Sequence, residues 1–144
     1  MKIGYIKKFE NLHGWGFIEC PEDDEDYFSI HRFVWLLKSL NEGVSRLKID
    51  WIKIQIQNWC REFHSKSDVR VFEPYSISER LVSWCFIITF VGQYVNGISF
   101  WNELRKSFQS QLQYLIKHLE YHGKFTNNHI LNNGRCLYIT GRLL

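Results

Sequence analysis

Several features common in other protein classes are missing from this 144-residue chain. Its four cysteines form no C-x-x-C pair, which argues against a zinc site and against a disulfide scaffold. The apolar run Leu81–Val91 is too short to span a bilayer, and we expect a buried helix there. No signal peptide is visible. These absences predict a protein of the reducing cytoplasm that does not enter a membrane.

Signals of catalysis or metal binding are also scarce. The sequence contains no Gly-rich phosphate loop and no recognisable setting for a nucleophile. His118 and His122 have i,i+4 spacing, but the Glu between them is misplaced for a zinc-protease motif, and no third ligand is evident. The acids of Glu22–Asp26 are expected to form a solvated loop. We therefore expect neither an enzyme nor a bound metal or cofactor.

Aromatic residues, by contrast, are abundant at 17% of the chain. The stretch HGWGFIEC, residues 13–20, places Trp15 and Phe17 on one face of a predicted strand, because residues two apart point to the same side. Two such rings can pack into a core or form a platform for bases. A buried strand rarely carries glycines beside its large rings, as Gly14 and Gly16 do here. The pattern therefore favours a platform.

The two halves of the chain differ in charge. Residues 1–74 contain 11 Lys+Arg and 12 Asp+Glu, whereas residues 75–144 contain 7 and 3. Much of the acid in the first half lies in the loop Glu22–Asp26, where it would repel phosphate. The contrast indicates two domains, 1–74 and 75–144.

The first half is rich in short β-like segments. An apolar segment with helical spacing, residues 32–43, interrupts them. The predicted strands are residues 2–10, 13–20, 27–31, 47–56 and 65–74. Five short strands in about 74 residues suggest a small five-stranded barrel of the OB type.

The string GYIKKFENLHGWGFIEC, with DYFSIH after it, resembles the start of a cold-shock domain. The strands of that family follow the patterns G-x-V-K-W-F, K-G-F-G-F-I and D-V-F-V-H. Lys8 replaces the Trp of the first pattern, and the register of the third leaves open whether Phe28 or His31 takes the family position. The matching residues are Gly4, Lys7, Phe9, Gly14, Gly16, Phe17, Ile18, Asp26 and Phe28.

The resemblance implies a surface whose rings stack on successive bases of single-stranded DNA or RNA, an interaction that tolerates any sequence. An RNA recognition motif has a similar aromatic strand, but it needs a strand and a helix before that strand, and only twelve residues are present here. The implied binding residues of the barrel are Lys7, Lys8, Phe9, His13, Trp15, Phe17, Phe28 and His31.

The second half is expected to contain helices and a hairpin. Ser76 and Glu79 predict a capped helix over 77–94, and Ser99 caps a second, short helix. A third helix begins at Ser107 or Ser110 and ends near Gly123. Two β-like segments, 124–130 and 135–141, follow and flank the turn signal Asn133-Gly134. Residues 100–141 are similar in this order to a winged helix-turn-helix.

In that family the third helix enters the major groove and its first residues contact base edges. The resemblance therefore implies base contacts by Gln109, Ser110, Gln111 and Gln113, and phosphate contacts by Lys106, Lys117 and Arg135. Many winged helices instead bind proteins or self-associate, so both kinds of partner stay open for this half.

The sequence as a whole predicts an α+β fold, with an OB-like barrel followed by a winged helix-turn-helix. The expected function is non-catalytic nucleic-acid binding by a regulator or a subunit of a nucleoprotein complex. Single-stranded nucleic acid is the expected partner of the barrel, and duplex DNA or a protein that of the winged helix. The alternative is a protein-interaction adaptor that uses both domains to scaffold a complex.

Overall fold

Helices account for most of the computed structural model, which describes residues 5–10, 15–19, 24–40, 43, 45–63, 70–95, 97–125 and 127–143. Side chains are described from residue 28 on within these ranges, Phe125 excepted. The elements are β1 (Tyr5–Glu10), β2 (Trp15–Glu19), α1 (Asp24–Arg32), α2 (Val34–Leu40), α3 (Arg46–Glu62), α4 (Pro74–Val91), η1 (Gly92–Tyr94), α5 (Ile98–Lys117), η2 (Gly123–Phe125) and α6 (His129–Leu143).

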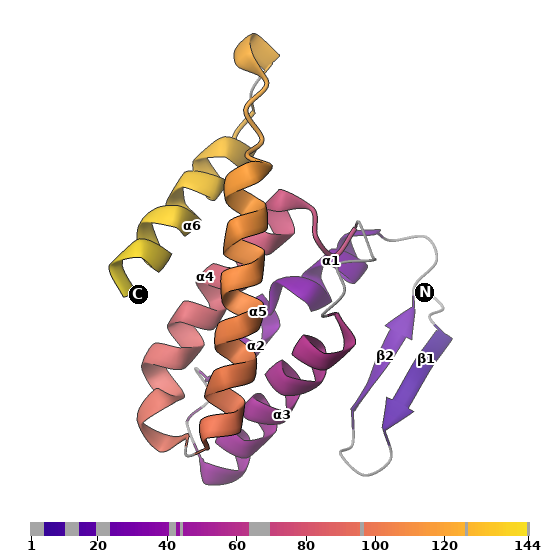
Figure 1. The fold of residues 1–144 in the computed structure, drawn as a ribbon. Helices are drawn as coiled ribbons and strands as arrows, with labels where there is room; N and C mark the ends of the chain where they lie inside the picture. The colour runs from indigo at the N-terminus through magenta and orange to yellow at the C-terminus, as the bar shows by residue number, and fades with distance from the viewer. Residues whose placement is uncertain are drawn as a thin grey trace.

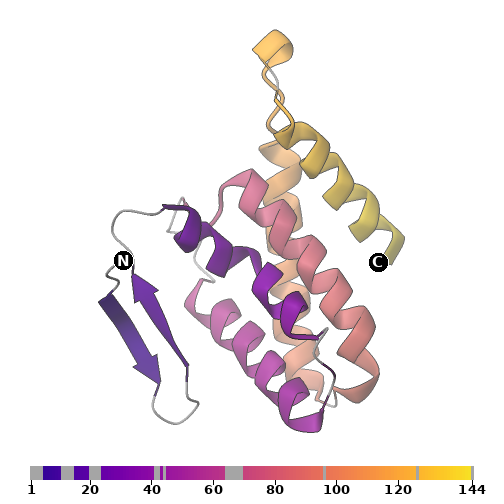
Figure 2. The same ribbon diagram turned by 180° about the vertical axis from the view of Figure 1, so that it is seen from behind.

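Helix α4 is the central element of the bundle. It contacts α1, α2, α5 and α6, while α3 packs against α5 (Figures 1 and 2). Pro74 occupies its first turn, where a missing N–H costs nothing. A helix that is apolar on most sides is expected to be buried on most sides, and the predicted buried helix at Leu81–Val91 is confirmed. None of the described helices is long and apolar enough to cross a membrane.

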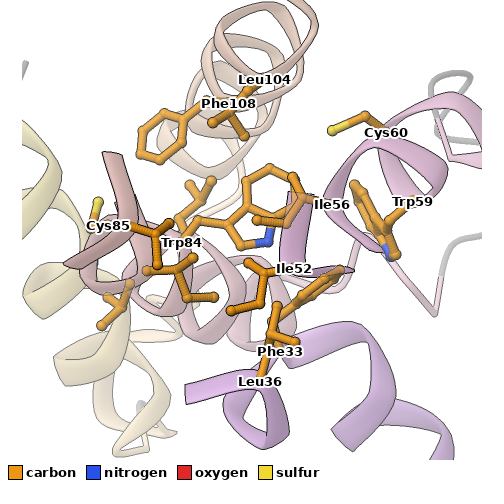
Figure 3. Close-up of a cluster of buried hydrophobic side chains, with 14 of the residues drawn as sticks. Phe33, Leu36, Ile52, Ile56, Trp59, Cys60, Trp84, Cys85, Leu104 and Phe108 are labelled. Carbon is orange, nitrogen blue, oxygen red and sulfur yellow. The ribbon is translucent and has the colours of Figure 1, made fainter. Parts of the chain in front are cut away.

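The core is built around Trp84 of α4, which is fully buried. Its ring meets those of Phe33 and Trp59 edge-on, with centroids 5.6 and 5.4 Å apart. Ile52 of α3 and Phe108 of α5 belong to the same cluster (Figure 3). Residues from both sides of position 74 thus share one core.

Helix α3 occupies a segment predicted as a strand. Its buried residues Ile49, Ile52, Ile56 and Trp59 follow three- and four-residue steps, which is the period of a helix. Ser45 caps its first turn, because the hydroxyl accepts a hydrogen bond from the backbone N–H of Lys48 at 3.2 Å. The strand was predicted because the ten-residue window 47–56 largely alternates apolar and polar residues. The structure has a helix there, so that prediction was wrong.

The described part of residues 1–74 does not form the predicted five-stranded barrel. Within the described ranges, the sheet consists of β1 and β2, an antiparallel pair with an irregular register between Ile6 and Lys8. The predicted strand 27–31 lies in α1, and 47–56 lies in α3. Residues 65–69 lie outside the described residues, and 70–73 form a turn before α4. A single hairpin cannot close a barrel, so the OB fold and the cold-shock resemblance were wrong.

The described residues of the second half do not form the predicted winged helix-turn-helix. The two predicted helices after Ser99 are one continuous helix, α5, which ends at Lys117. The predicted hairpin over 124–141 is η2 followed by α6. Asn133 and Gly134 form no turn and lie within α6. Asn133 is fully buried where α6 packs on α4, and its side-chain amide donates a hydrogen bond to Ser78 of α4. The observed fold is therefore a helical bundle with a small hairpin rather than an α+β barrel and wing.

Candidate functional site

One face of α5 is a long polar surface. Its exposed residues recur at three- and four-residue steps, so they line up along the helix, which lies at the front of the bundle in Figure 1. We call this face the α5 stripe. It carries three cations, three amides and one apolar side chain, and it contains no acid. Its members are Asn102, Arg105, Lys106, Gln109, Gln113, Ile116 and Lys117.

The one acid of α5 is turned away from this stripe. Glu103 accepts hydrogen bonds from Arg61 at 3.2 Å and from Gln57 at 3.4 Å, both on α3. Because the carboxylate is engaged by α3, it neutralises Arg61 rather than the cations of the stripe. The α5 stripe therefore presents a positive electrostatic surface.

A cavity of about 520 Å³ opens between the end of α3 and the middle of α5. We call it the α3–α5 pocket. Two phenyl rings and a thiol form the apolar part of the pocket wall. Charged and hydroxyl groups of α5 form much of the polar part. Lys106 belongs to both the pocket and the α5 stripe. The lining residues are Cys60, Arg61, Phe63, Phe72, Glu103, Lys106, Ser107, Ser110 and Gln111.

A fully buried arginine lies behind this pocket. Arg80 of α4 donates to Oε1 of Gln111 at 2.6 Å and to the backbone carbonyls of His31 at 3.0 Å and Val71 at 3.1 Å. Its guanidinium also stacks on Trp59, 4.2 Å from the ring centroid. Burial lowers the pKa of Arg80. All three hydrogen-bond acceptors are neutral oxygens, while nearby Cys60 and the Glu73 carboxylate oppose part of the effect of burial on the pKa.

The buried thiols are weakly acidic. Burial raises the pKa of Cys60 to about 11, with a smaller opposing effect from a hydrogen bond with Ser107. Burial likewise raises the pKa of Cys85 to about 11 and that of Cys136 to about 12. A thiol in this state is a poor nucleophile and a poor metal ligand.

We expect these thiols to react slowly in the native protein. In a Cys20→Ser variant, which removes the thiol outside the described residues, native protein at neutral pH should react with Ellman's reagent at least about 100-fold more slowly than unfolded protein. Burial blocks access of the reagent and, by raising the pKa of the thiols to about 11 or 12, also lowers the thiolate fraction. The measurement is thiol release with and without urea. Equal rates in both conditions would contradict the burial of Cys60, Cys85 and Cys136.

A second polar network joins α4 and α6 at the end of the bundle. His129 Nδ1 lies 2.8 Å from Glu120 Oε1, and the buried amide of Asn133 donates to Glu120 Oε2 at 3.3 Å and to Ser78 at 3.1 Å. The backbone N–H of Glu120 donates in turn to Asn133 Oδ1 at 3.0 Å. A carboxylate held in this way by Asn133 fixes the orientation of the His129 imidazole.

Aromatic and cationic groups continue that network. The ring of Tyr75 lies 4.6 Å from that of His129, and the guanidinium of Arg32 lies 4.9 Å from the Tyr75 ring centroid. Arg32 also donates to the hydroxyl of Ser76 at 3.1 Å. Across the residues with described side chains, no three His, Cys, Asp or Glu are grouped so as to hold a metal ion.

The structure separates the residues predicted for the winged helix. Lys106, Gln109, Gln113 and Lys117 share the α5 stripe, and Ser110 lines the pocket. Two others do not fit a common surface. Gln111 is 1% exposed and binds Arg80, and Arg135 lies on α6, where it is paired with Glu79.

The residues predicted for the barrel do not form a described surface. The side chains of Lys7, Lys8, Phe9, Trp15 and Phe17 and all of His13 lie outside what the structure describes. Phe28 lies beside Arg32 in α1. His31 is buried, and its Nδ1 accepts a hydrogen bond from Trp59 Nε1 at 3.0 Å, so it is a core residue.

Sequence reasoning missed three parts of this site. Arg105 was overlooked because α5 was divided into two helices; the continuous 3.6-residue period from Phe100 to Leu115 could have revealed it. Phe72 lies within the segment 65–74 that was predicted as a strand, and Phe63 lies between the predicted strands 47–56 and 65–74. No local sequence pattern predicts the buried role of Arg80, because its hydrogen-bond partners lie 9, 31 and 49 residues away in the chain.

Comparisons with known proteins add no relative. No protein-family model matches the chain, and neither the curated proteins nor the solved structures contain a significant match.

Proposed function

We propose that this chain is a non-catalytic nucleic-acid-binding protein of the cytoplasm, and that the α5 stripe contacts the sugar-phosphate backbone. The observation that carries the proposal is an exposed helix face with Arg105, Lys106 and Lys117 and no acid. Lys and Arg supply most of the affinity of proteins for nucleic acid, because each phosphate contact releases counterions. The excess of basic residues in 75–144 acts in the same direction.

The dimensions and the amides of the stripe suit a nucleic-acid strand. From Asn102 to Lys117 the helix axis rises about 22 Å, which corresponds to about six nucleotides at the 3.4 Å spacing of one strand in a duplex and to fewer nucleotides of an extended single strand. Asn102, Gln109 and Gln113 are exposed between the cations. Amide groups donate to phosphate and sugar oxygens and can also pair with base edges.

Protein-interaction scaffolding is the second candidate function. It is favoured by Phe86 and Phe90, which are one helical turn apart on α4 and are 46% and 59% exposed. Two exposed rings form a small apolar surface that a protein partner could cover. This candidate becomes the better account if the protein binds no oligonucleotide.

The proposal predicts a specific loss of salt dependence. A variant with Arg105→Gln, Lys106→Gln and Lys117→Gln should show a salt slope for single strands smaller by about two units, at roughly 0.7 per phosphate contact. The measurement is the anisotropy of a labelled 12-mer titrated with protein at several salt concentrations. The matched control is Arg135→Gln, which removes a cation that already pairs with Glu79 and should leave the slope unchanged.

Three outcomes would count against this function. Unchanged affinity and slope in the triple variant would remove the stripe from the binding surface. Equal competition by heparin and by an oligonucleotide of the same total charge would make the stripe a general polyanion surface. Absence of binding by the wild type at low salt would end the nucleic-acid assignment.

A further inference from the structure

The α3–α5 pocket has the size and walls of a small-ligand site. Its volume of about 520 Å³ lies within the range of roughly 300–1,000 Å³ that such sites occupy. Phe63 and Phe72 line it beside the thiol of Cys60. The Phe63 ring is half-buried and is braced by the rings of Trp59 and His31, 5.2 and 4.9 Å away. A flat ring placed in this pocket would meet an aromatic wall.

The charges around the pocket favour an anion at its mouth. Arg80 lies behind Gln111 and Phe72; its three hydrogen-bond acceptors are uncharged, and the Glu73 carboxylate that acts on it electrostatically is not hydrogen-bonded to it and does not line the pocket. Lys106 is exposed at the rim. The carboxylate at the rim, Glu103, is engaged by Arg61. An apolar interior with positive charge behind it and at its edge fits a planar ring that carries a phosphate outside.

The pocket is continuous with the proposed strand-binding surface. Lys106 lines the pocket and belongs to the α5 stripe, and Ser110 follows it one helical turn later on the pocket wall. A strand whose phosphates lie on the stripe would therefore pass the opening of the pocket. In a duplex the bases are paired and stacked, and one base could enter only after unpairing.

We propose that the α3–α5 pocket receives one unpaired base of a strand bound on the α5 stripe, with the adjoining phosphate at Lys106. This inference rests on the proposed function and adds a preference for single strands. Stacking on the aromatic wall accounts for affinity without selecting a sequence, since every base has a π face.

The test separates base binding from phosphate binding. The probes are a labelled dT12 and an abasic 12-mer, which has the same phosphates and no bases. Wild-type protein should bind dT12 roughly fivefold or more tightly than the abasic strand, as expected for one stacked base. Ser110→Trp fills the pocket and should remove this preference while leaving affinity for the abasic strand unchanged. Ser99→Trp, the same change more than two turns away on α5, should keep the preference.

A second variant and a second probe keep each result decisive. If Ser110→Trp is misfolded by circular dichroism, Phe63→Leu, which removes one ring, should reduce the preference for dT12. Equal affinity of wild type for dT12 and the abasic strand would overturn the inference, as would a preference that survives Ser110→Trp. If no oligonucleotide binds, the proposed function fails, and thymidine 5′-monophosphate then tests the pocket alone. Calorimetric binding of this nucleotide that Ser110→Trp abolishes would support the pocket as a base-binding site. No binding would overturn that assignment.

Discussion

Replacement of Arg80 by methionine is expected to destabilise the protein by about 3 kcal/mol or more. Methionine fills much of the same volume, so the cost reports mainly the lost polar contacts. Three acceptors that Arg80 now satisfies, Gln111 Oε1 and the carbonyls of His31 and Val71, would be left unpaired. Each buried unpaired acceptor costs about 1–3 kcal/mol. Relief from burying a charge offsets part of this loss.

Urea unfolding followed by circular dichroism measures this effect. The matched control is Arg61→Met, whose guanidinium is mostly exposed and pairs with Glu103 at 3.2 Å. An exposed ion pair contributes about 0–1 kcal/mol, so the control should remain close to wild type. If Arg80→Met is as stable as Arg61→Met, the buried network contributes no net stability.

Trp84→Ala is expected to cost about 3–5 kcal/mol, because it opens a large cavity at the centre of the core. Trp84 is 0% exposed, and it is in ring contact with Phe33 and Trp59. Since a domain of this size has about 5–15 kcal/mol of stability in total, the variant should be marginal or unfolded at room temperature. The measurement is again the free energy of unfolding in urea.

Trp84→Phe distinguishes ring packing from the indole N–H. Among the described residues, Trp84 Nε1 has no hydrogen-bond partner. Phenylalanine removes this unpaired donor, which is favourable, and leaves a smaller cavity than alanine. We therefore expect Trp84→Phe to lose much less stability than Trp84→Ala. Equal losses would show that the indole N–H makes a hydrogen bond in solution.

Local sequence patterns predicted some of this molecule correctly. The apolar run Leu81–Val91 indicated a buried helix, and it lies in α4 at the centre of the bundle. The apolar segment 32–43 indicated a helix, and α2 lies within it. The first prediction rested on an unbroken apolar run and the second on apolar residues at helical spacing, and both signals depend little on the rest of the chain.

Short sequence windows led to wrong predictions where one segment fits both the two-residue period of a strand and the 3.6-residue period of a helix. Residues 47–56 satisfy both an alternating and a helical pattern, and only the continuation through Trp59 and Cys60 separates them. The cold-shock resemblance added to this error. Its motifs near Trp15 and Phe17 suggested a barrel, so residues 27–31 and 47–56 were predicted as barrel strands although they are helical. At Asn133-Gly134 a strong local turn signal was overridden by the buried bonds of Asn133 to Ser78 and Glu120.

For the candidate site, the sequence by itself determined the charge excess of the second half and the residue types of α5. Tertiary structure alone decided their roles. Gln109 is exposed and Gln111 is buried, because α5 packs on α3 and α4 and turns Gln111 toward Arg80. The pocket likewise exists only where the end of α3 meets α5. The hydrogen-bond partners and the cavity walls come from segments far apart in the chain. Such long-range contacts leave no pattern in a local sequence window, so only the folded structure defines them.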